Sequence, residues 1–284
     1  MHTYLCPMQN PCTKDNNRTL LQTYFIIYPT MKAMIFAAGL GTRLKPLTDT
    51  LPKALVPLAG KTLLQWQIER LKAVGINDIV INVHHFPDMI VNYLKENHNF
   101  GCNIQISDER NMLLETGGGL RKAKELLTSS SPEEPILICN VDILSNISIP
   151  TLLQAYNPSE MGVVVVSLRT TQRYFVFDET NKLCGWTNIT TGDVKGAEAV
   201  KGLNDKQKSM QLLAFSGMHL LNPRVFNRLD EMAAIKGEKF SLIDLYIHIA
   251  DKEVVRAFIP DKYRMMDVGK IDQLSEAEAF AAMI

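Results

Sequence analysis

The stretch Met34-Ile-Phe-Ala-Ala-Gly-Leu-Gly-Thr-Arg-Leu-Lys-Pro-Leu-Thr48 joins an apolar run to a glycine-rich turn. The run Met34–Ala38 predicts a buried strand. The glycines that follow allow backbone N–H groups to approach phosphate oxygens closely. Arg43 offers a planar guanidinium that can bind two oxygens at once, and Lys53 adds a second positive charge in the next loop. This arrangement indicates a site for a nucleoside triphosphate.

The spacing of the glycines excludes two other phosphate-binding motifs. A dinucleotide-binding fingerprint requires a third glycine at the position of Leu44. A P-loop that ends in Gly60-Lys61-Thr62 requires its first glycine at the position of Leu55. The remaining alternative is an ordinary turn between a strand and a helix that carries basic residues by chance.

The composition is that of a globular protein of one large domain or two small ones. Of the 284 residues, 46% are hydrophobic and 21% are charged, and 30 basic residues balance 30 acidic ones. A neutral chain gives no electrostatic reason to expect nucleic acid or an anionic membrane as a partner. The five cysteines form no Cys-x-x-Cys, and no apolar run approaches the length of a membrane span. We therefore expect a reduced, cytoplasmic protein.

The first half of the chain alternates between the strand and helix patterns. Strands are expected over Met34–Ala38, Ile79–Val83, Asn103–Ile106 and Ile136–Cys139, and helices over Thr62–Val74, Met89–Asn97 and Gly119–Leu127. This alternation predicts an α/β fold that is Rossmann-like and doubly wound, in which a mainly parallel mixed sheet has helices on both faces. Ligands of such sheets bind beyond the carboxyl ends of the strands.

The pattern changes after Pro150. We expect strands over Val163–Leu168 and Glu253–Pro260, a hairpin over Arg173–Asn188, a loop over Lys195–Lys208, a strand that contains Gly217 over Leu212–Leu221, and helices over Arg224–Ile235 and Leu242–Asp251. Residues 1–30 have neither a helical nor a strand period and lack the pattern of a secretory signal. They are expected to be an upstream extension outside the core fold.

Several segments together resemble the signature of sugar-1-phosphate nucleotidyltransferases. The glycine-rich stretch is followed by PKALVPLAGK at residues 52–61, then by LETGGGL at 114–120, NVD at 140–142, FSG at 215–217, FSLIDL at 240–245 and MDVG at 266–269. They come in the order of the family and extend from Met31 to the C-terminus. Within the family, LETGGG and the short chain most resemble N-acetylmuramate-1-phosphate uridylyltransferases.

The resemblance implies a GT-A-like fold and a single catalytic domain over residues 31–284, with a nucleotide half at 31–150 and a sugar half at 151–284. It also implies the reaction of a nucleoside triphosphate with a sugar-1-phosphate, which gives an NDP-sugar and pyrophosphate. The best match is UTP with N-acetylmuramate-1-phosphate, a step of cell-wall sugar recycling. The protein is expected to be a monomer or a small homo-oligomer.

The chemistry of this reaction indicates which residue types to expect. The nucleophile is a phosphate oxygen that is largely ionised at neutral pH, so the protein needs cations, a metal and rigid positioning. By the resemblance, Arg43 binds the β- and γ-phosphates, Lys53 binds the α-phosphate or the sugar phosphate, and Asp142 and Asp267 hold one Mg²⁺. Val141 and Met265 depart from the family pattern, in which a glycine and an aromatic residue are usual. The alternatives are surface ion pairs and helix caps.

The other site residues follow from the same resemblance. The nucleotide is expected to contact Gly39, Leu40, Gly41, Thr42, Glu109, Gly117 and Gly118, although the glycines could instead open a helix. The sugar is expected to contact Asn140, Gly217 and Lys239, with Asp244 as a further candidate.

Three other functions remain open. One is guanylyl transfer to mannose-1-phosphate or a heptose phosphate. Another is cytidylyl transfer to a small acceptor such as phosphocholine, for which the second half of the chain is larger than needed. The third is a silent regulatory subunit that binds an NDP-sugar, against which the presence of Arg43, Lys53 and both aspartates argues.

Overall fold

A computed structural model describes residues 30–129, 131, 133–197, 200 and 210–284. The extension predicted at residues 1–30 lies almost entirely outside the described residues, as does most of the loop predicted at 195–208. Within the described part, no helix is both long and apolar enough to cross a membrane.

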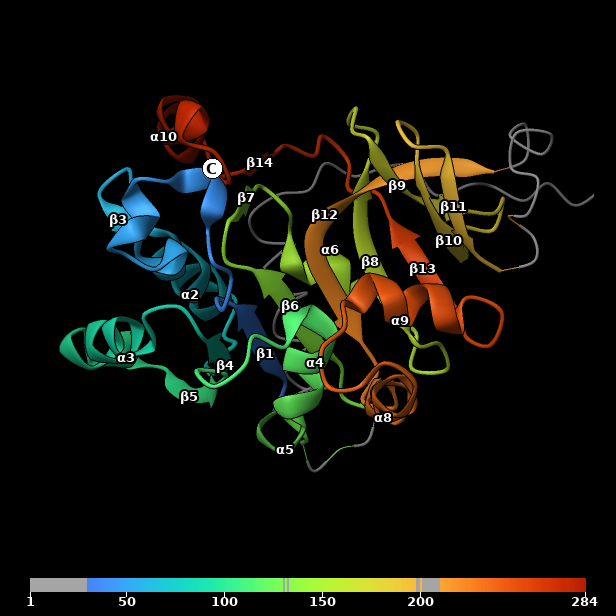
Figure 1. Cartoon of the computed structure of the whole chain (residues 1–284), viewed down its shortest axis with the longest axis horizontal. Coiled ribbons are helices and arrows are strands. Elements are labelled where there is room, and N and C mark those ends of the chain that lie inside the picture. The colour runs from blue at the N-terminus through green and yellow to red at the C-terminus, as the bar shows by residue number, and fades with distance from the viewer. Residues whose placement is uncertain (1–29, 130, 132, 198–199, 201–209) are drawn as a thin grey trace, which may run out of the picture.

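A ten-stranded mixed sheet runs through the molecule (Figure 1). Its order is β11-β10-β9-β12-β6-β1-β4-β5, and β8 pairs with both β12 and β13. The pairs β6–β1, β1–β4, β4–β5 and β8–β13 are parallel, and the others are antiparallel. The strands are β1 (Lys32–Phe36), β4 (Asp78–Val83), β5 (Asn103–Asp108), β6 (Ile136–Asn140), β8 (Gly162–Ser167), β9 (Arg173–Phe177), β10 (Leu183–Asn188), β11 (Asp193–Gly196), β12 (Gln211–Leu221) and β13 (Val255–Phe258).

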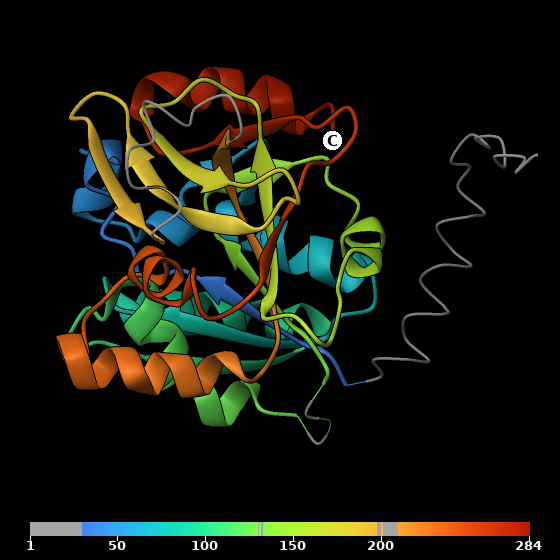
Figure 2. The same cartoon turned by 90° about the vertical axis from the view of Figure 1, so that its right-hand side faces the viewer.

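Helices cover both faces of this sheet. Figure 2 shows the orange helix α8 and the yellow-green helix α6 on opposite sides of it. One core cluster contains side chains of α2 (Leu63–Ala73), α3 (Pro87–Glu96), α6 (Ile149–Gln154) and α10 (Leu274–Ala281). The other contains side chains of α4 (Glu115–Lys122), α5 (Lys124–Leu127), α8 (Val225–Lys236) and α9 (Leu242–Ile249). The predicted α/β fold is confirmed.

The alternation of side chains along β1 explains why its apolar run has no polar face. Ala33 and Ile35 belong to one core cluster, whereas Met34 and Phe36 belong to the other. A strand that is covered on both faces needs apolar residues at every position. β6 follows the same rule, since Leu137 and Ile138 lie in different clusters.

Four features differ from the sequence-based expectation. Lys195 and Gly196, predicted as the start of a loop, belong to strand β11. The helix predicted at Gly119–Leu127 begins at Glu115 and divides into α4 and α5. Two short antiparallel pairs were not predicted, namely β2 (Pro57–Leu58) with β3 (Lys61–Thr62), and β7 (Ile143–Ser145) with β14 (Met265–Asp267). Strands of two or three residues are too short to show a period of two, so their sequences carry no signal.

The loop after β1 is built from three short 3₁₀ turns, η1 (Thr42–Leu44), η2 (Leu47–Asp49) and η3 (Lys53–Leu55). Gly41 opens the first turn at φ +64°, in the left-handed region that favours glycine. A Cβ at Gly41 would lie 2.8 Å from Thr48 Cγ2 and 3.0 Å from Lys53 Cβ, and the Thr48 hydroxyl donates to the Gly41 carbonyl oxygen at 2.8 Å. Gly41 therefore lets the loop fold tightly enough to bring Lys53 back to β1.

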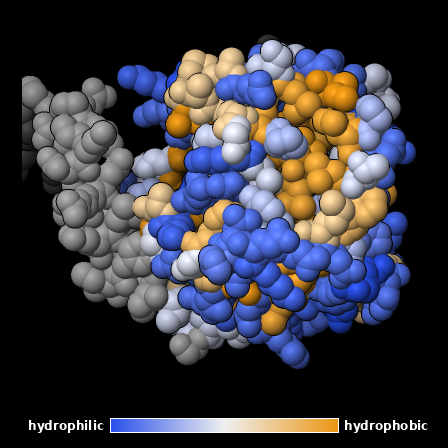
Figure 3. Space-filling model, turned by 90° about the vertical axis from the view of Figure 1, so that its left-hand side faces the viewer, coloured by the Kyte–Doolittle hydropathy of each residue, from blue (hydrophilic) through white to orange (hydrophobic). Residues whose placement is uncertain are grey.

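The surface at the end of the molecule that carries α3 and α10 has a hydrophobic part and a hydrophilic part (Figure 3). Hydrophobic atoms gather in the upper right of this view, and hydrophilic atoms dominate its lower half. Exposed apolar side chains of the chain include Leu40 and Leu47, which belong to the loop after β1.

Candidate active site

A cavity of about 380 Å³ lies where β1 and β6 end. These parallel neighbours present their carboxyl ends at the same edge of the sheet, where ligands of α/β proteins bind. The lining residues are Phe36, Ala37, Ala38, Gly39, Lys53, Asn82, Leu113, Glu115, Thr116, Asn140, Val141, Asp142 and Ser241. The predicted residues Gly39, Lys53, Asn140 and Asp142 are therefore brought together in one cavity.

A chain of hydrogen bonds fixes the backbone at one wall of this cavity. The Ala37 N–H donates to Asn82 Oδ1 at 2.7 Å, and Asn82 Nδ2 donates to Glu109 Oε1 at 2.7 Å. The Leu114 N–H donates to Glu109 Oε2 at 3.1 Å. Glu109 is 1% exposed, and burial raises the pKa of its carboxyl. Its observed contacts are thus with the protein, and its predicted contact with a base stays a prediction.

The glycines of LETGGG pack against the segment before α9. The N–H groups of Gly117 and Gly118 both donate to the Phe240 carbonyl oxygen, at 2.9 and 3.0 Å. A Cβ at Gly117 would lie 2.6 Å from the Phe240 ring. These amides donate within the protein in this arrangement, and the predicted contact of Gly117 and Gly118 with a nucleotide stays a prediction. The glycines bring α4 close enough to place Thr116 and Ser241 on the cavity wall.

Lys53 and Asp142 form an ion pair inside the cavity. Their side chains are 10% and 17% exposed, so the pair is shielded from water and from salt. Asp142 lies two residues after the end of β6, and its carbonyl oxygen accepts from the Val268 N–H at 2.8 Å. This bond, with the pairing of β7 and β14, brings Asp267 beside Asp142 although the two are far apart in the sequence.

Asp267 has the character of a ligand for a cation. Its Oδ1 is buried without a hydrogen-bond partner, and Arg43 Nη2 lies 4.0 Å from its Oδ2. Burial raises the pKa of the Asp267 carboxyl, and the negative charge of Asp142 raises it further. Two neighbouring carboxylates with a free oxygen favour a bound cation.

A single Mg²⁺ fits this pair of carboxylates. The described residues contain no group of three or more histidine, cysteine, aspartate and glutamate side chains that could hold a metal by themselves. Mg²⁺ does not need one, because it usually binds one or two carboxylates and completes its shell with water and substrate phosphates. The predicted metal ligands Asp142 and Asp267 are therefore suitable for an ion that arrives with a nucleotide.

A second cavity, of about 920 Å³, has Asp267 on its wall. Arg43 reaches it with a side chain that is 58% exposed, and Gly269 leaves room beside it, since a Cβ there would lie 2.7 Å from Arg43 Nη2. The wall is formed by Arg43, Arg169, Thr170, Thr171, Gln172, Arg173, Tyr174, Phe175, Trp186, Ile189, Phe215, Ile243, Asp267, Lys270 and Gln273. The Lys53–Asp142 pair lines the first cavity and the Arg43–Asp267 pair lines the second, so the neighbouring residues Asp142 and Asp267 connect the two.

Several predicted residues lie outside both cavity walls. Gly217 adopts φ +75° within β12, where a Cβ would lie 2.5 Å from Ile143 Cγ1, so it allows β12 to pass close to β7. Lys239 is exposed in the loop before α9, and Leu40 is 41% exposed. Asp244 caps α9, because its carboxylate accepts from the Ser241 N–H at 3.0 Å. Contacts of these residues with substrates stay predictions.

The sequence reasoning missed several cavity-lining residues. Asn82 interrupts the apolar run of β4, and a buried amide at a strand end is a signal that could have been used. Ser241 could have been found from its place beside the predicted helix. Arg169 and Arg173 carry no such signal, because exposed arginines are common and only the fold brings them to one cavity.

Comparisons with known proteins agree with this geometry. The family model described as nucleotidyl transferase matches residues 32–283. The N-acetylmuramate alpha-1-phosphate uridylyltransferase of Caulobacter vibrioides is 34% identical over 200 residues, which are 68% of this chain and 76% of that protein. Mannose-1-phosphate guanylyltransferase 1 of Arabidopsis thaliana is 33% identical over 57% of this chain and 48% of that protein. The structure of a UDP-glucose pyrophosphorylase with UDP-glucose aligns at TM-score 0.66 and 18% identity, covering 89% of this chain and 98% of that one.

Proposed function

We propose a specific reaction for this chain, which belongs to the nucleotidyl transferase family and is a sugar-1-phosphate nucleotidyltransferase. The reaction is transfer of the uridylyl group of UTP to N-acetylmuramate-1-phosphate, which gives a UDP-sugar for cell-wall recycling and releases pyrophosphate. The observation that carries the proposal is the line of charges formed by Lys53, Asp142, Asp267 and Arg43 on the walls of the two cavities. Such a line suits transfer of a phosphoryl-type group from one bound anion to another.

In this proposal, residues 31–150 bind the nucleotide and residues 151–284 bind the sugar. The base and ribose occupy the cavity at the ends of β1 and β6, so Asn140 on its wall would contact the ribose and not the sugar to which the resemblance assigns it. The backbone of Gly39 and of the turn after it faces the phosphates. The sugar-1-phosphate occupies the cavity beyond Asp267.

The bond changes need only positioning and positive charge. An oxygen of the sugar phosphate attacks the α-phosphorus, and the bond from that phosphorus to the bridging oxygen of pyrophosphate breaks. Lys53 neutralises the α-phosphate or the incoming phosphate, and Arg43 stabilises the charge on the departing pyrophosphate. A bound Mg²⁺ would supply further positive charge at the phosphates, held by Asp142 and Asp267. No protein nucleophile is required.

The relatives support two candidate nucleotides. The Caulobacter vibrioides protein is named a uridylyltransferase, and it is 34% identical to this chain over 200 residues, against 33% over 180 residues for the Arabidopsis thaliana guanylyltransferase. Guanylyl transfer to mannose-1-phosphate is therefore the second candidate. Cytidylyl transfer to a small acceptor is a weaker one, because the second cavity is much larger than phosphocholine needs.

A substrate panel tests the proposal. Each of UTP, GTP, CTP and dTTP is combined with N-acetylmuramate-1-phosphate, mannose-1-phosphate, glucose-1-phosphate or phosphocholine, with Mg²⁺ present, and pyrophosphate release is measured. We expect the highest kcat/KM for UTP with N-acetylmuramate-1-phosphate. A higher kcat/KM for GTP with mannose-1-phosphate would instead identify the protein as a mannose-1-phosphate guanylyltransferase.

A further inference from the structure

The second cavity carries more positive charge than a neutral sugar requires. Four basic side chains line it, and Asp267 is the one carboxylate among the described lining residues. One phosphate and one metal-binding carboxylate account for only part of this charge. The basic residues are Arg43, Arg169, Arg173 and Lys270.

Two of these arginines belong to the end of the cavity near the metal ligands. Arg43 Nη2 lies 4.0 Å from Asp267 Oδ2. Arg169 is held by a hydrogen bond from its Nη2 to the Phe215 carbonyl oxygen at 2.9 Å, and it lines the same cavity as Arg43 and Asp267. Arg43 is assigned to the departing pyrophosphate, so Arg169 is the arginine of this end that remains for the 1-phosphate that attacks the nucleotide.

Arg173 stands on a different part of the wall. It begins β9 opposite Asn188 of β10, and Phe175 stands opposite Trp186 in the same register. Since alternate residues of a strand share a face, Arg173, Phe175 and Trp186 lie on one face of the hairpin, and all three line the cavity. Among the described residues, no carboxylate pairs with Arg173. Its guanidinium is thus available to a ligand.

Strand β12 connects the two ends of the cavity. It pairs with β9 so that Leu213 stands opposite Phe175, which places Arg173 near the level of Phe215. Gly217, two residues further along β12, packs against Ile143, the neighbour of Asp142. The ladder between β12 and β8 shifts register between Phe215 and His219, so this stretch is not regular strand. A hexose between the two ends would present its phosphate to Arg169 and its far side to Arg173.

We propose that Arg173 binds a carboxylate on the sugar ring and thereby selects a sugar-1-phosphate that carries a second negative charge. The position of the 1-phosphate rests on the proposed function, whereas the recognition of a second acidic group by Arg173 goes beyond it. An arginine suits this role because its planar fork binds a carboxylate through two hydrogen bonds. The face of Trp186 beside it offers an apolar platform for the ring.

The test compares two substrates that differ in this group alone. N-acetylmuramate-1-phosphate carries a lactyl carboxylate where N-acetylglucosamine-1-phosphate has a hydroxyl. We expect Arg173→Met to lower kcat/KM for the first by about 10- to 100-fold, mainly through KM, as the loss of a charge-assisted hydrogen bond implies. For the second, kcat/KM should change little. Arg173→Lys should lie between, because lysine keeps the charge but not the fork.

A matched control variant and a second pair of substrates distinguish failure of the inference about Arg173 from failure of the proposed reaction. Lys182→Met removes a positive charge from the turn of the same hairpin at a residue outside the cavity wall, and it should preserve the preference for the acidic sugar. Equal effects of Arg173→Met on both substrates, or none, would overturn the inference while leaving the proposed reaction in place. If wild type uses neither substrate with UTP, the proposed reaction fails. The inference is then tested with the preferred nucleotide on glucuronate-1-phosphate and glucose-1-phosphate, where equal use by wild type and Arg173→Met would overturn it.

Discussion

Arg43 combines a large expected role in catalysis with a small one in folding. Its side chain is 58% exposed, and its one ion pair, to Asp267, is 4.0 Å long. A positioned cation on developing charge is worth a few kcal/mol in the transition state. We therefore predict that Arg43→Ala lowers kcat at saturating nucleotide by about 100-fold or more, while the thermal unfolding midpoint changes little. Lys45→Ala is the control, because Lys45 lies in the same loop and pairs with Asp49 at 2.8 Å. Near-normal turnover of Arg43→Ala would refute the assignment.

The two aspartates should control metal binding separately from folding. We predict that EDTA abolishes turnover, that Mg²⁺ or Mn²⁺ restores it, and that Asp142→Asn and Asp267→Asn each weaken Mn²⁺ binding in the presence of nucleotide by about tenfold or more. Electron paramagnetic resonance of free Mn²⁺ measures the affinity directly. Asp49→Asn, a change in the exposed loop after β1, is the control. Affinities equal to wild type in both variants would place the ion elsewhere.

Helix α4 depends on glycine for its close approach to the chain before α9. A Cβ at Gly118 would collide with the Glu238 carbonyl oxygen, which is backbone and cannot rotate away. We predict that Gly118→Ala lowers the free energy of unfolding by about 1–3 kcal/mol. Urea denaturation measures this, and KM for the nucleotide should rise because Ser241 shifts. In Gly39→Ala the new Cβ meets nothing within 4 Å, so its stability should match wild type. Unchanged stability of Gly118→Ala would show that the contact is looser in solution.

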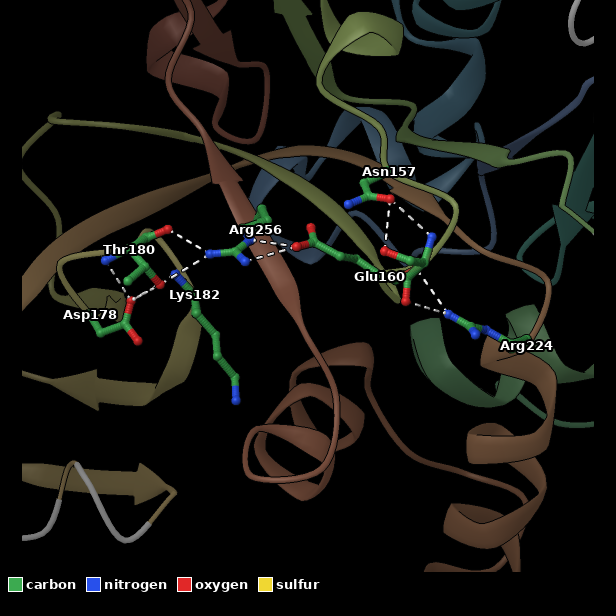
Figure 4. A network of polar contacts seen from close by, with 8 residues as sticks. Asn157, Glu160, Asp178, Thr180, Lys182, Arg224 and Arg256 are labelled. Carbon is green, nitrogen blue, oxygen red and sulfur yellow. Dashed lines mark hydrogen bonds and ion pairs between the residues drawn. The ribbon is translucent and has the colours of Figure 1, made fainter.

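Strand β13 ties the β9–β10 turn to the loop before β8 through Arg256 (Figure 4). Its Nε and Nη2 donate to Glu160 Oε1 at 2.9 and 2.8 Å, and its Nη1 donates to the Thr180 carbonyl oxygen at 2.7 Å. The Glu160 side chain is only 14% exposed. We predict that Arg256→Met destabilises the fold by about 1–3 kcal/mol, because it leaves a shielded carboxylate unpaired.

A double-mutant cycle separates the pair from its surroundings. Arg256→Met with Glu160→Gln should cost less than the sum of the two single changes in urea denaturation, since neither partner is then left charged and alone. Additive costs would show that the two side chains do not interact in solution.

Features that depend on neighbouring residues could be predicted from the sequence, whereas features that depend on contacts between distant segments could not. The apolar runs of β1 and β6 identify buried strands by themselves, so the layered α/β fold follows from the sequence. The proximity of Asp142 and Asp267 does not, because it depends on the pairing of β7 with β14, whose strands have three residues each. Glycines show a similar limit. LETGGG predicts a close approach, but only the structure identifies Phe240 as the neighbour.

A buried histidine should make the stability of the protein depend on pH. His219 is 3% exposed, and its Nδ1 shares a hydrogen bond of 2.6 Å with the Tyr246 hydroxyl. Burial lowers the pKa of His219 from 6.5 to about 3. Phe215 also packs on the ring, at a centroid distance of 4.4 Å. The imidazole is therefore neutral in the folded protein at pH values where the unfolded chain is already protonated.

This difference fixes the direction of the pH effect. Below pH 6.5 the unfolded state binds one more proton than the folded state, so the stability that His219 contributes is full above that pH and is lost as the pH falls toward 3. By pH 4.5 the loss is about 2–3 kcal/mol, from about 1.4 kcal/mol per pH unit. His219→Asn keeps a polar group near the Tyr246 hydroxyl but cannot titrate. The variant should therefore be less stable than wild type at pH 8 and should approach it as the pH falls. Urea denaturation at pH 8, 6.5, 5.5 and 4.5 measures both curves, and parallel curves would show that His219 is not the source of the acid sensitivity.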